Sequence, residues 1–250
     1  MSLYQRLRAQ LRPLASGLRH LRRSARGIPQ PGTVDFGDLR RTSPLCADYG
    51  YDRGLPIDRI YIEAFIAKHT ADLRGCVLEV QEDDYARRFG GTAVERCDVL
   101  DLDPTNPRAT VIADLTDAPQ LAAESYDAII LTQTLQLIYD LDAAVATLHR
   151  LLKPGGVLLC TVSGISSVGR SGGEDAQWCW SFTPGSLQRL LAARFEPDAV
   201  SAEAFGNVLT AVAFLEGLAA AELEPAEFEA RDPAYPVVVA ARALKAAHPR

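Results

Sequence analysis

The sequence has no paired cysteines. Its five cysteines are scattered along the chain, with neither a CxxC pair nor a CxxC…HxxxH spacing: Cys46, Cys76, Cys97, Cys160 and Cys179. A disulfide framework or a structural zinc site requires such pairs. We therefore expect free thiols and no bound metal.

Long apolar runs are also missing. None approaches the roughly 18 residues that a membrane-spanning helix requires, and the N-terminal residues lack the continuous apolar core of a secretory signal. The sequence therefore predicts a cytoplasmic protein. Its 250 residues are enough for one large domain or two small ones.

Acidic residues are absent from residues 1–34, which hold seven arginines, whereas the rest of the chain carries 19 basic and 32 acidic residues. Leucines in the same segment recur at steps of three or four and mark one face of a helix: Leu3, Leu7, Leu11, Leu14, Leu18 and Leu21. Pro13 interrupts this stripe and is expected to kink or split the helix. Residues 1–34 are thus predicted to be a basic amphipathic arm followed by a linker.

The sequence leaves four roles open for this arm. Residues 1–26 can bind the anionic inner surface of a membrane peripherally, dock on an acidic protein partner, pack on the acidic part of this chain, or form a loosely ordered arm. Nucleic-acid binding is not expected, because the body is acidic and basic residues do not alternate with aromatic ones. A homo-oligomer is compatible with the sequence.

After the arm, residues 35–74 contain one helical segment and are expected to form a cap or lid. Residues 75–250 then alternate between short apolar runs and amphipathic segments. The expected strands are Cys76–Val80, Val94–Leu100, Thr110–Asp114, Tyr126–Thr132, Gly156–Val162, Ala199–Ala204 and Tyr235–Leu244. The expected helices are Pro56–His69, Asp84–Phe89, Leu141–Leu152, Ser186–Phe195 and Asn207–Leu218. This alternation predicts an α/β fold, a mostly parallel sheet with helices on both faces.

Acidic residues accompany the first three expected strands. Glu79 lies at the end of the first strand, Asp98 lies within the second, and Asp114 ends the third. Ligands of such sheets bind beyond the carboxyl ends of the strands. We favour Asp98 for the ribose hydroxyls, with Asp101 and Asp103 as competitors, and Asp114 for an adenine amine. The alternative is that these acids are solvated or cap helices.

A longer stretch resembles a known family. The run ATVIADLTDAPQLAAESYDAIILTQTLQLIYDLDAAVATLHRLLKPGGVLLCTVSGIS is similar to class I S-adenosylmethionine-dependent methyltransferases of the type 11 group. Asp114 after the third strand, Asp127 opening the fourth, and Lys153–Gly156 before the fifth match the family in order and spacing. The resemblance covers residues 75–162 well and is looser on either side.

The resemblance implies a Rossmann-like methyltransferase domain over residues 75–250, with a seven-stranded sheet whose last strand is antiparallel. It implies S-adenosylmethionine as cofactor, with Asp98 at the ribose and Asp114 with Leu115 at the adenine. Glu79 would orient the first loop and the methionine moiety, while Thr132 and Gln133 would line the sulfonium. The layout is similar to bacterial methyltransferases found beside glycosyltransferases, which implies oxygen methylation of a small-molecule or glycan-like acceptor.

The turn after the first strand departs from the family. Where the family has GxGxG, this chain has Gln81, Asp83 and Tyr85. Because the cofactor has no phosphates, it does not need a phosphate-binding turn, and Gln81 is retained as a cofactor-binding residue. Acids at positions 82–84 would offset the charge of the sulfonium and amine.

A second hypothesis follows from the missing glycines: a methyltransferase-fold protein that is a non-methylating enzyme, a scaffold or a regulatory partner. A nicotinamide-dependent oxidoreductase is disfavoured, because the chain has no GxGxxG turn.

Residues for the acceptor are sought outside the cofactor segment. The stretch YDRGLPIDR offers Tyr51, Arg53 and Arg59, and Trp180 follows the fifth strand after a glycine-rich loop. The alternatives are a salt-bridged surface turn for the former and core packing for the latter. No general base is assigned; the candidates are Asp58, His69, His149, Glu174 and Asp175.

Overall fold

The computed structural model describes residues 27–169 and 178–247. The arginine-rich segment 1–26 and the candidate bases Glu174 and Asp175 lie outside the described residues. The chain divides into two compact units, residues 1–42 and 43–250, and the second contains the sheet and both of its helical layers. Within the described part of the chain, no helix is both long and apolar enough to cross a membrane.

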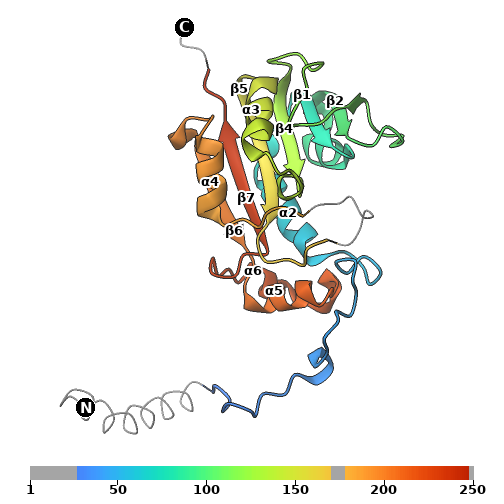
Figure 1. Ribbon diagram of the computed structural model, residues 1–250, viewed down its shortest axis with the longest axis vertical. Coiled ribbons are helices and arrows are strands. Elements are labelled where there is room, and N and C mark those ends of the chain that lie inside the picture. The colour runs from blue at the N-terminus through green and yellow to red at the C-terminus, as the bar shows by residue number, and fades with distance from the viewer. Residues whose placement is uncertain (1–26, 170–177, 248–250) are drawn as a thin grey trace, which may run out of the picture. The chain divides into compact units, whose positions relative to one another are not determined.

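The second unit is built on one seven-stranded sheet (Figure 1). Its strands are β1 (Gly75–Val80), β2 (Val94–Asp101), β3 (Val111–Ile112), β4 (Tyr126–Thr132), β5 (Leu152–Ser163), β6 (Val200–Phe205) and β7 (Val238–Leu244). They lie in the order β3-β2-β1-β4-β5-β7-β6. β7 is antiparallel to both of its neighbours, and the remaining pairs are parallel. The predicted fold class is therefore confirmed.

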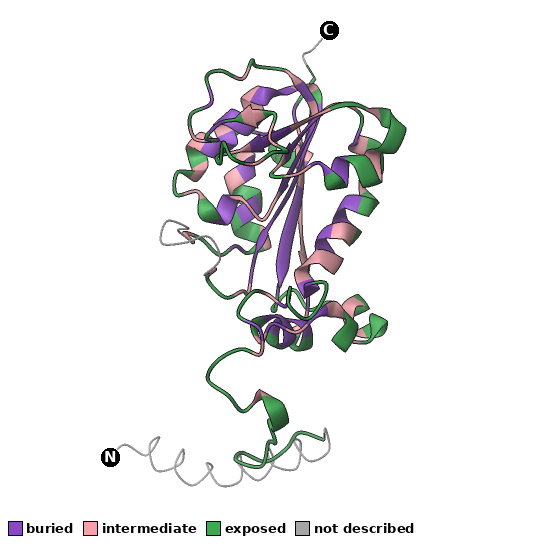
Figure 2. Ribbon diagram, turned by 90° about the vertical axis from the view of Figure 1, so that its right-hand side faces the viewer, coloured by how far each residue is buried: buried purple, intermediate pink, exposed green. Residues whose placement is uncertain are grey.

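Helices cover both faces of this sheet (Figure 2). They are α2 (Ile57–Lys68), α3 (Leu141–Leu151), α4 (Pro184–Ala192), α5 (Val208–Leu215) and α6 (Pro225–Glu229). Alternation along β4 assigns the layers: Ile129 and Leu131 pack in one core with α3 and α4, whereas Ala128 and Ile130 pack in the other with α2 and α5. Because α2 is part of this second core, it belongs to the same unit as the sheet.

The predicted start of the fifth strand was wrong for a local reason. The break expected at Lys153–Gly156 is a bulge inside β5: Leu152 pairs with Tyr126 and Val157 with Ala128. Lys153 Nζ lies 2.6 Å from the carboxylate of Asp127 and stabilises this bulge.

The third strand is shorter than predicted, because only Val111 and Ile112 pair with β2 at that edge of the sheet. The segment expected as a helix at Asp84–Phe89 contains a π-helical turn, Ala86–Gly90. The short helix α6 was not predicted.

The layer containing α2 gives a test of the fold. Phe205, at the end of β6, is 1% exposed, and its ring centroid lies 5.9 Å from that of Tyr61 and 6.3 Å from that of Phe65. We predict that Phe205→Ala lowers the free energy of unfolding by about 3–5 kcal/mol, through lost burial and the cavity left behind. Urea unfolding measures this, with Leu209→Ala as the control, since Leu209 is 46% exposed. Equal losses in both variants would contradict the packing described.

Candidate functional site

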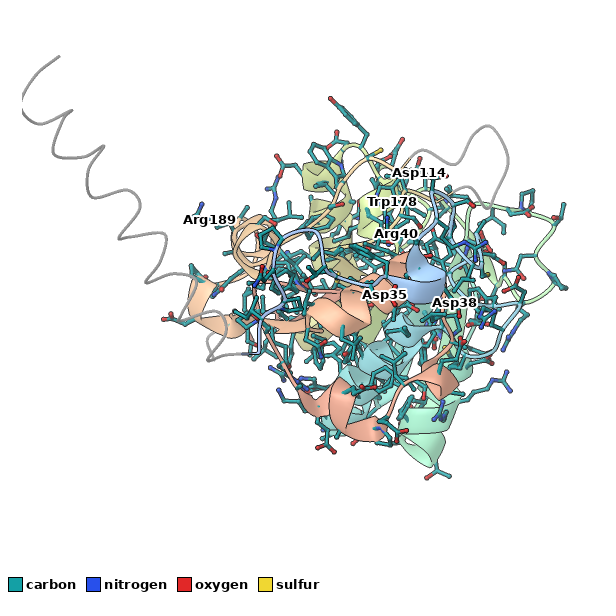
Figure 3. The ribbon with its side chains drawn as sticks, turned by 90° about the horizontal axis from the view of Figure 1, so that it is seen from below. Asp35, Asp38, Arg40, Asp114, Trp178 and Arg189 are labelled. Carbon is teal, nitrogen blue, oxygen red and sulfur yellow. The ribbon has the colours of Figure 1, made fainter. Side chains whose placement is uncertain are left out.

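Two adjoining cavities lie at the carboxyl ends of the central strands. The smaller, about 160 Å³, has apolar walls that include Leu100, Leu102 and Leu115, together with the carboxylates of Asp101 and Asp114. The larger, about 290 Å³, is lined by aromatic and polar side chains, among them Tyr49, Asp58, Arg59, Gln136, Trp178 and Phe214. Figure 3 labels one residue of each cavity, Asp114 and Trp178. The site thus combines an apolar compartment with a polar, aromatic one.

Gln81, Gln133 and Leu137 line both cavities and so form their junction. Gln81 is the first residue after β1 and Gln133 the first after β4; both have left-handed backbone, with φ of 69° and 50°. Their N–H groups donate to Leu100 O at 2.9 Å and to Thr161 O at 2.8 Å, respectively. Sparsely populated backbone conformations of non-glycine residues occur preferentially at functional sites. Here they turn the chain sharply at two neighbouring strand ends.

Glu79 stabilises the turn after β1 through hydrogen bonds to its backbone. Its buried carboxylate accepts the backbone N–H of Tyr85 at 3.1 Å and of Ala86 at 2.8 Å. Burial raises the pKa of Glu79 to about 7, although the two N–H donors act to lower it. Glu79 is therefore an internal support of the turn.

Arg108, in the loop between β2 and β3, binds the acids of the turn. Its guanidinium contacts Glu82 at 3.3 Å, Asp83 at 2.7 Å, and Asp84. Burial would raise the pKa of Asp83, but hydrogen bonds from Arg87 and Arg108 outweigh it and hold that pKa below its ordinary value. We expected the acids at positions 82–84 to offset the positive charge of the sulfonium and amine. In the structure they pair with arginine instead.

Asn106 ties the same loop to both β1 and β2. Its Nδ2 donates to Gln81 O at 2.8 Å and to Asp101 Oδ2 at 2.6 Å. Sequence analysis missed Asn106 and Arg108, because neither belongs to a motif and their partners lie far along the chain. The one available signal is that Arg108 is the only arginine or lysine between Arg96 and Arg150.

Only some of the predicted cofactor residues line the cavities. Gln81 and Gln133 line both cavities, and Asp114 and Leu115 line the smaller one. Thr132 ends β4 directly before the junction, half-buried.

Asp98 is not among the residues that line either cavity. It lies within β2, where its carboxylate accepts Tyr126 Oη–H at 2.9 Å and Arg96 is 3.3 Å away. β2 continues to Asp101, so the carboxylate at the end of the strand is that of Asp101.

Of the predicted acceptor residues, two line the larger cavity and two do not. Tyr51 and Arg59 line the larger cavity, and Arg59 Nε donates to Tyr51 Oη at 3.1 Å. Arg53 instead pairs with Glu222 at an exposed position. Trp180 donates its indole N–H to Ile138 O at 3.0 Å and packs on Tyr139, so the tryptophan that lines the cavity is Trp178.

Asp58 and Arg59 bring opposite charges to the wall of the larger cavity from the first turn of α2. Asp58 Oδ1 is buried and has no hydrogen-bond partner among the described residues. Burial raises the pKa of Asp58, against the lowering effect of Arg59 and backbone N–H groups. Burial acts to lower the pKa of Arg59, but the opposite effect of Asp58 and Tyr85 is larger. The pKa of Arg59 is therefore raised above its ordinary value, and the guanidinium stays charged.

The two candidate histidines line neither cavity. His69 packs on Phe65 and His149 on Phe195, each with ring centroids 4.9 Å apart, and burial lowers the pKa of both imidazoles. Among residues 27–169 and 178–247, no group of three or more His, Cys, Asp or Glu side chains is arranged to hold a metal ion.

Residues 84–160 match the family model described as a methyltransferase domain. A SAM-dependent methyltransferase from Archaeoglobus fulgidus is similar in structure, with a TM-score of 0.50 at 14% identity over 75% of this chain and 94% of that chain. The fold is the Rossmann-like methyltransferase fold.

Two further solved structures have TM-scores just below this value. The [4+2]-cyclase SpnF has a TM-score of 0.49 at 18% identity, over 76% of this chain and 81% of that chain. A Burkholderia thailandensis 1,6-didemethyltoxoflavin-N1-methyltransferase was solved with bound 1,6-didemethyltoxoflavin and S-adenosylhomocysteine. It has a TM-score of 0.47 at 15% identity, over 74% of this chain and 77% of that chain. No curated protein matches the chain significantly.

The raised pKa of Glu79 predicts a pH-dependent stability. Because its folded-state pKa of about 7 exceeds the ordinary value, the folded protein binds a proton more tightly than the unfolded chain. Stability should then fall as pH rises from about 4.5 to about 7, by on the order of 3 kcal/mol. Glu79→Gln should flatten this dependence in urea unfolding across that range.

Asp198→Asn, which changes an exposed carboxylate, serves as the control and should leave the dependence intact. An unchanged slope in Glu79→Gln would show that Glu79 is not the titrating group.

Proposed function

We propose that the protein is an S-adenosylmethionine-dependent methyltransferase that methylates an oxygen atom of a small-molecule or glycan-like acceptor. The main support is the pair of cavities, which differ in chemistry and meet at Gln81, Gln133 and Leu137. They lie at the carboxyl ends of the strands, where α/β sheets bind their ligands. The match of residues 84–160 to the methyltransferase domain agrees with this assignment.

The smaller cavity suits an adenosine group. Its apolar walls fit a flat base, and Asp114 accepts the adenine amine while Leu115 packs beside it. Asp101 takes the ribose role that sequence analysis gave to Asp98, because it ends β2 and lines the cavity. Asn106 orients its carboxylate through the 2.6 Å hydrogen bond. Such a ligand has no phosphate, so the missing glycine turn is no obstacle.

When bound, S-adenosylmethionine supplies a methyl group activated by a sulfonium. Gln133 would line that end of the ligand, since it lies at the junction of the cavities. Thr132, the residue before it at the end of β4, is proposed to lie beside the same end. Gln136 fixes the Gln133 side chain by donating to its Oε1 at 2.7 Å. The protein contributes alignment of the two reactants, which provides most of the rate of an in-line displacement.

The larger cavity is the proposed acceptor site. Tyr49, Trp178 and Phe214 present aromatic surface on which a ring can stack and which excludes water. Gln136 is 1% exposed, and its Oε1 has no hydrogen-bond partner among the described residues. A bound hydroxyl group can supply that donor, which favours a polyhydroxylated or phenolic acceptor.

Isothermal titration with S-adenosylhomocysteine tests the proposal. We predict that the protein binds it, and that Asp101→Asn and Asp114→Asn each weaken binding by tenfold or more, since each replaces a charged hydrogen-bond acceptor by a neutral amide. Asp98→Asn is the matched control and should bind like the wild type, because Asp98 is bonded to Tyr126.

Two outcomes would change the assignment. Absence of binding at millimolar ligand would reject the cofactor and leave the non-methylating or regulatory alternative. A loss confined to Asp98→Asn would restore Asp98 as the ribose residue.

A further inference from the structure

We propose that Asp58 and Arg59 bind the zwitterionic amino-acid tail of the cofactor, in place of the glycine turn that the chain lacks. Arg59 would take the α-carboxylate and Asp58 the α-ammonium. This inference rests on the proposed function and identifies which residues of the larger cavity contact the cofactor.

The turn after β1 is poorly suited to this role. Gln81 uses its N–H on Leu100 O and its carbonyl on Asn106. The acids that follow are bound by Arg108. The backbone of Gln81 and the charges of the three acids are therefore engaged within the protein.

Asp58 has the properties of an ammonium site. It lines the larger cavity, its Oδ1 is buried, and no described residue donates to that atom. A buried carboxylate oxygen without a donor is costly unless a cation or a proton compensates it. An ammonium ligand would provide Oδ1 of Asp58 with a charged donor.

Arg59 has the properties of a carboxylate site. Its Nε donates to Tyr51 Oη at 3.1 Å and its Nη1 to Tyr85 Oη at 3.2 Å, so two hydroxyls hold the guanidinium in place. A guanidinium carries five N–H donors in a planar fork that matches a carboxylate. Further donors of Arg59 can therefore bind a ligand while the tyrosines fix its orientation.

The two residues match an α-amino acid as a pair. They are consecutive, opposite in charge and placed in the first turn of α2, so they add no net charge to the cavity. The larger cavity joins the smaller at Gln81 and Gln133. A ligand whose nucleoside fills the smaller cavity can extend its tail through this junction towards both residues. The competing role of Asp58, as a general base for the acceptor, does not require it to contact the cofactor.

Isothermal titration with two ligands tests the inference. S-adenosylhomocysteine carries the amino-acid tail, and 5′-methylthioadenosine has the same nucleoside and sulfur without it. We expect the wild type to bind the former at least thirtyfold more tightly. Asp58→Asn and Arg59→Gln should each lose tenfold or more in affinity for S-adenosylhomocysteine and less than twofold for 5′-methylthioadenosine. Retained binding of the tailless ligand also shows that each variant is folded.

Arg53→Gln is the matched control, because it removes a nearby arginine that pairs with Glu222 on the surface. It should leave both affinities unchanged. Equal wild-type affinity for the two ligands would overturn the inference while leaving the proposed function standing. Equal losses for both ligands in the variants would also overturn it. Binding of neither ligand by the wild type would reject the proposed function itself.

Discussion

The contact between the β2–β3 loop and the turn after β1 determines the geometry of the site. Asn106 joins Gln81 O to the carboxylate of Asp101, and Arg108 binds the three acids that follow Gln81. Without these contacts, three consecutive carboxylates would repel one another beside a buried Glu79. With them, the turn closes without glycine, and its first residue stands between the two cavities.

This arrangement also sorts the charges of the site. Arg108 and Arg87 pair with the acids of the turn, whereas Asp58 and Arg59 line the larger cavity. A charge in a partly enclosed site acts more strongly than one in water. The recognition of a charged ligand tail is therefore expected to depend on α2, an element that precedes the sheet in sequence. α2 packs in the same core as α5 and β7, so its first turn is fixed by the apolar layer beneath it.

Much of the fold could be predicted from the sequence, because burial on both faces leaves a plain signal. The bounds of β4 were predicted correctly from a continuous apolar run, and the antiparallel β7 from family resemblance. The site residues were less predictable where the choice between neighbouring candidates depends on which residues pair in the sheet or hydrogen-bond across loops. The run DVLDLD offers three acids, and only the pairing of Asp101 with Ile112 shows where β2 ends. The same holds for Trp178 and Trp180, since the backbone bonds of residues 179 and 180 to Gln136 O decide which ring lines the cavity.

The glycine missing at position 81 therefore has a physical explanation. Gln81 adopts a φ of 69°, a conformation that costs a non-glycine residue about 1–3 kcal/mol. Two hydrogen bonds, to Leu100 O and from Asn106, hold it there, and each contributes about 1 kcal/mol. Glycine would adopt the same backbone without that cost but would leave the junction of the cavities without a side chain. A residue kept in a strained conformation where two cavities meet is better explained by its side chain than by its backbone. Gln81 in place of glycine suggests a lost site when only the sequence is considered. In the structure it fits a site in which the side chains around the larger cavity replace the glycine turn.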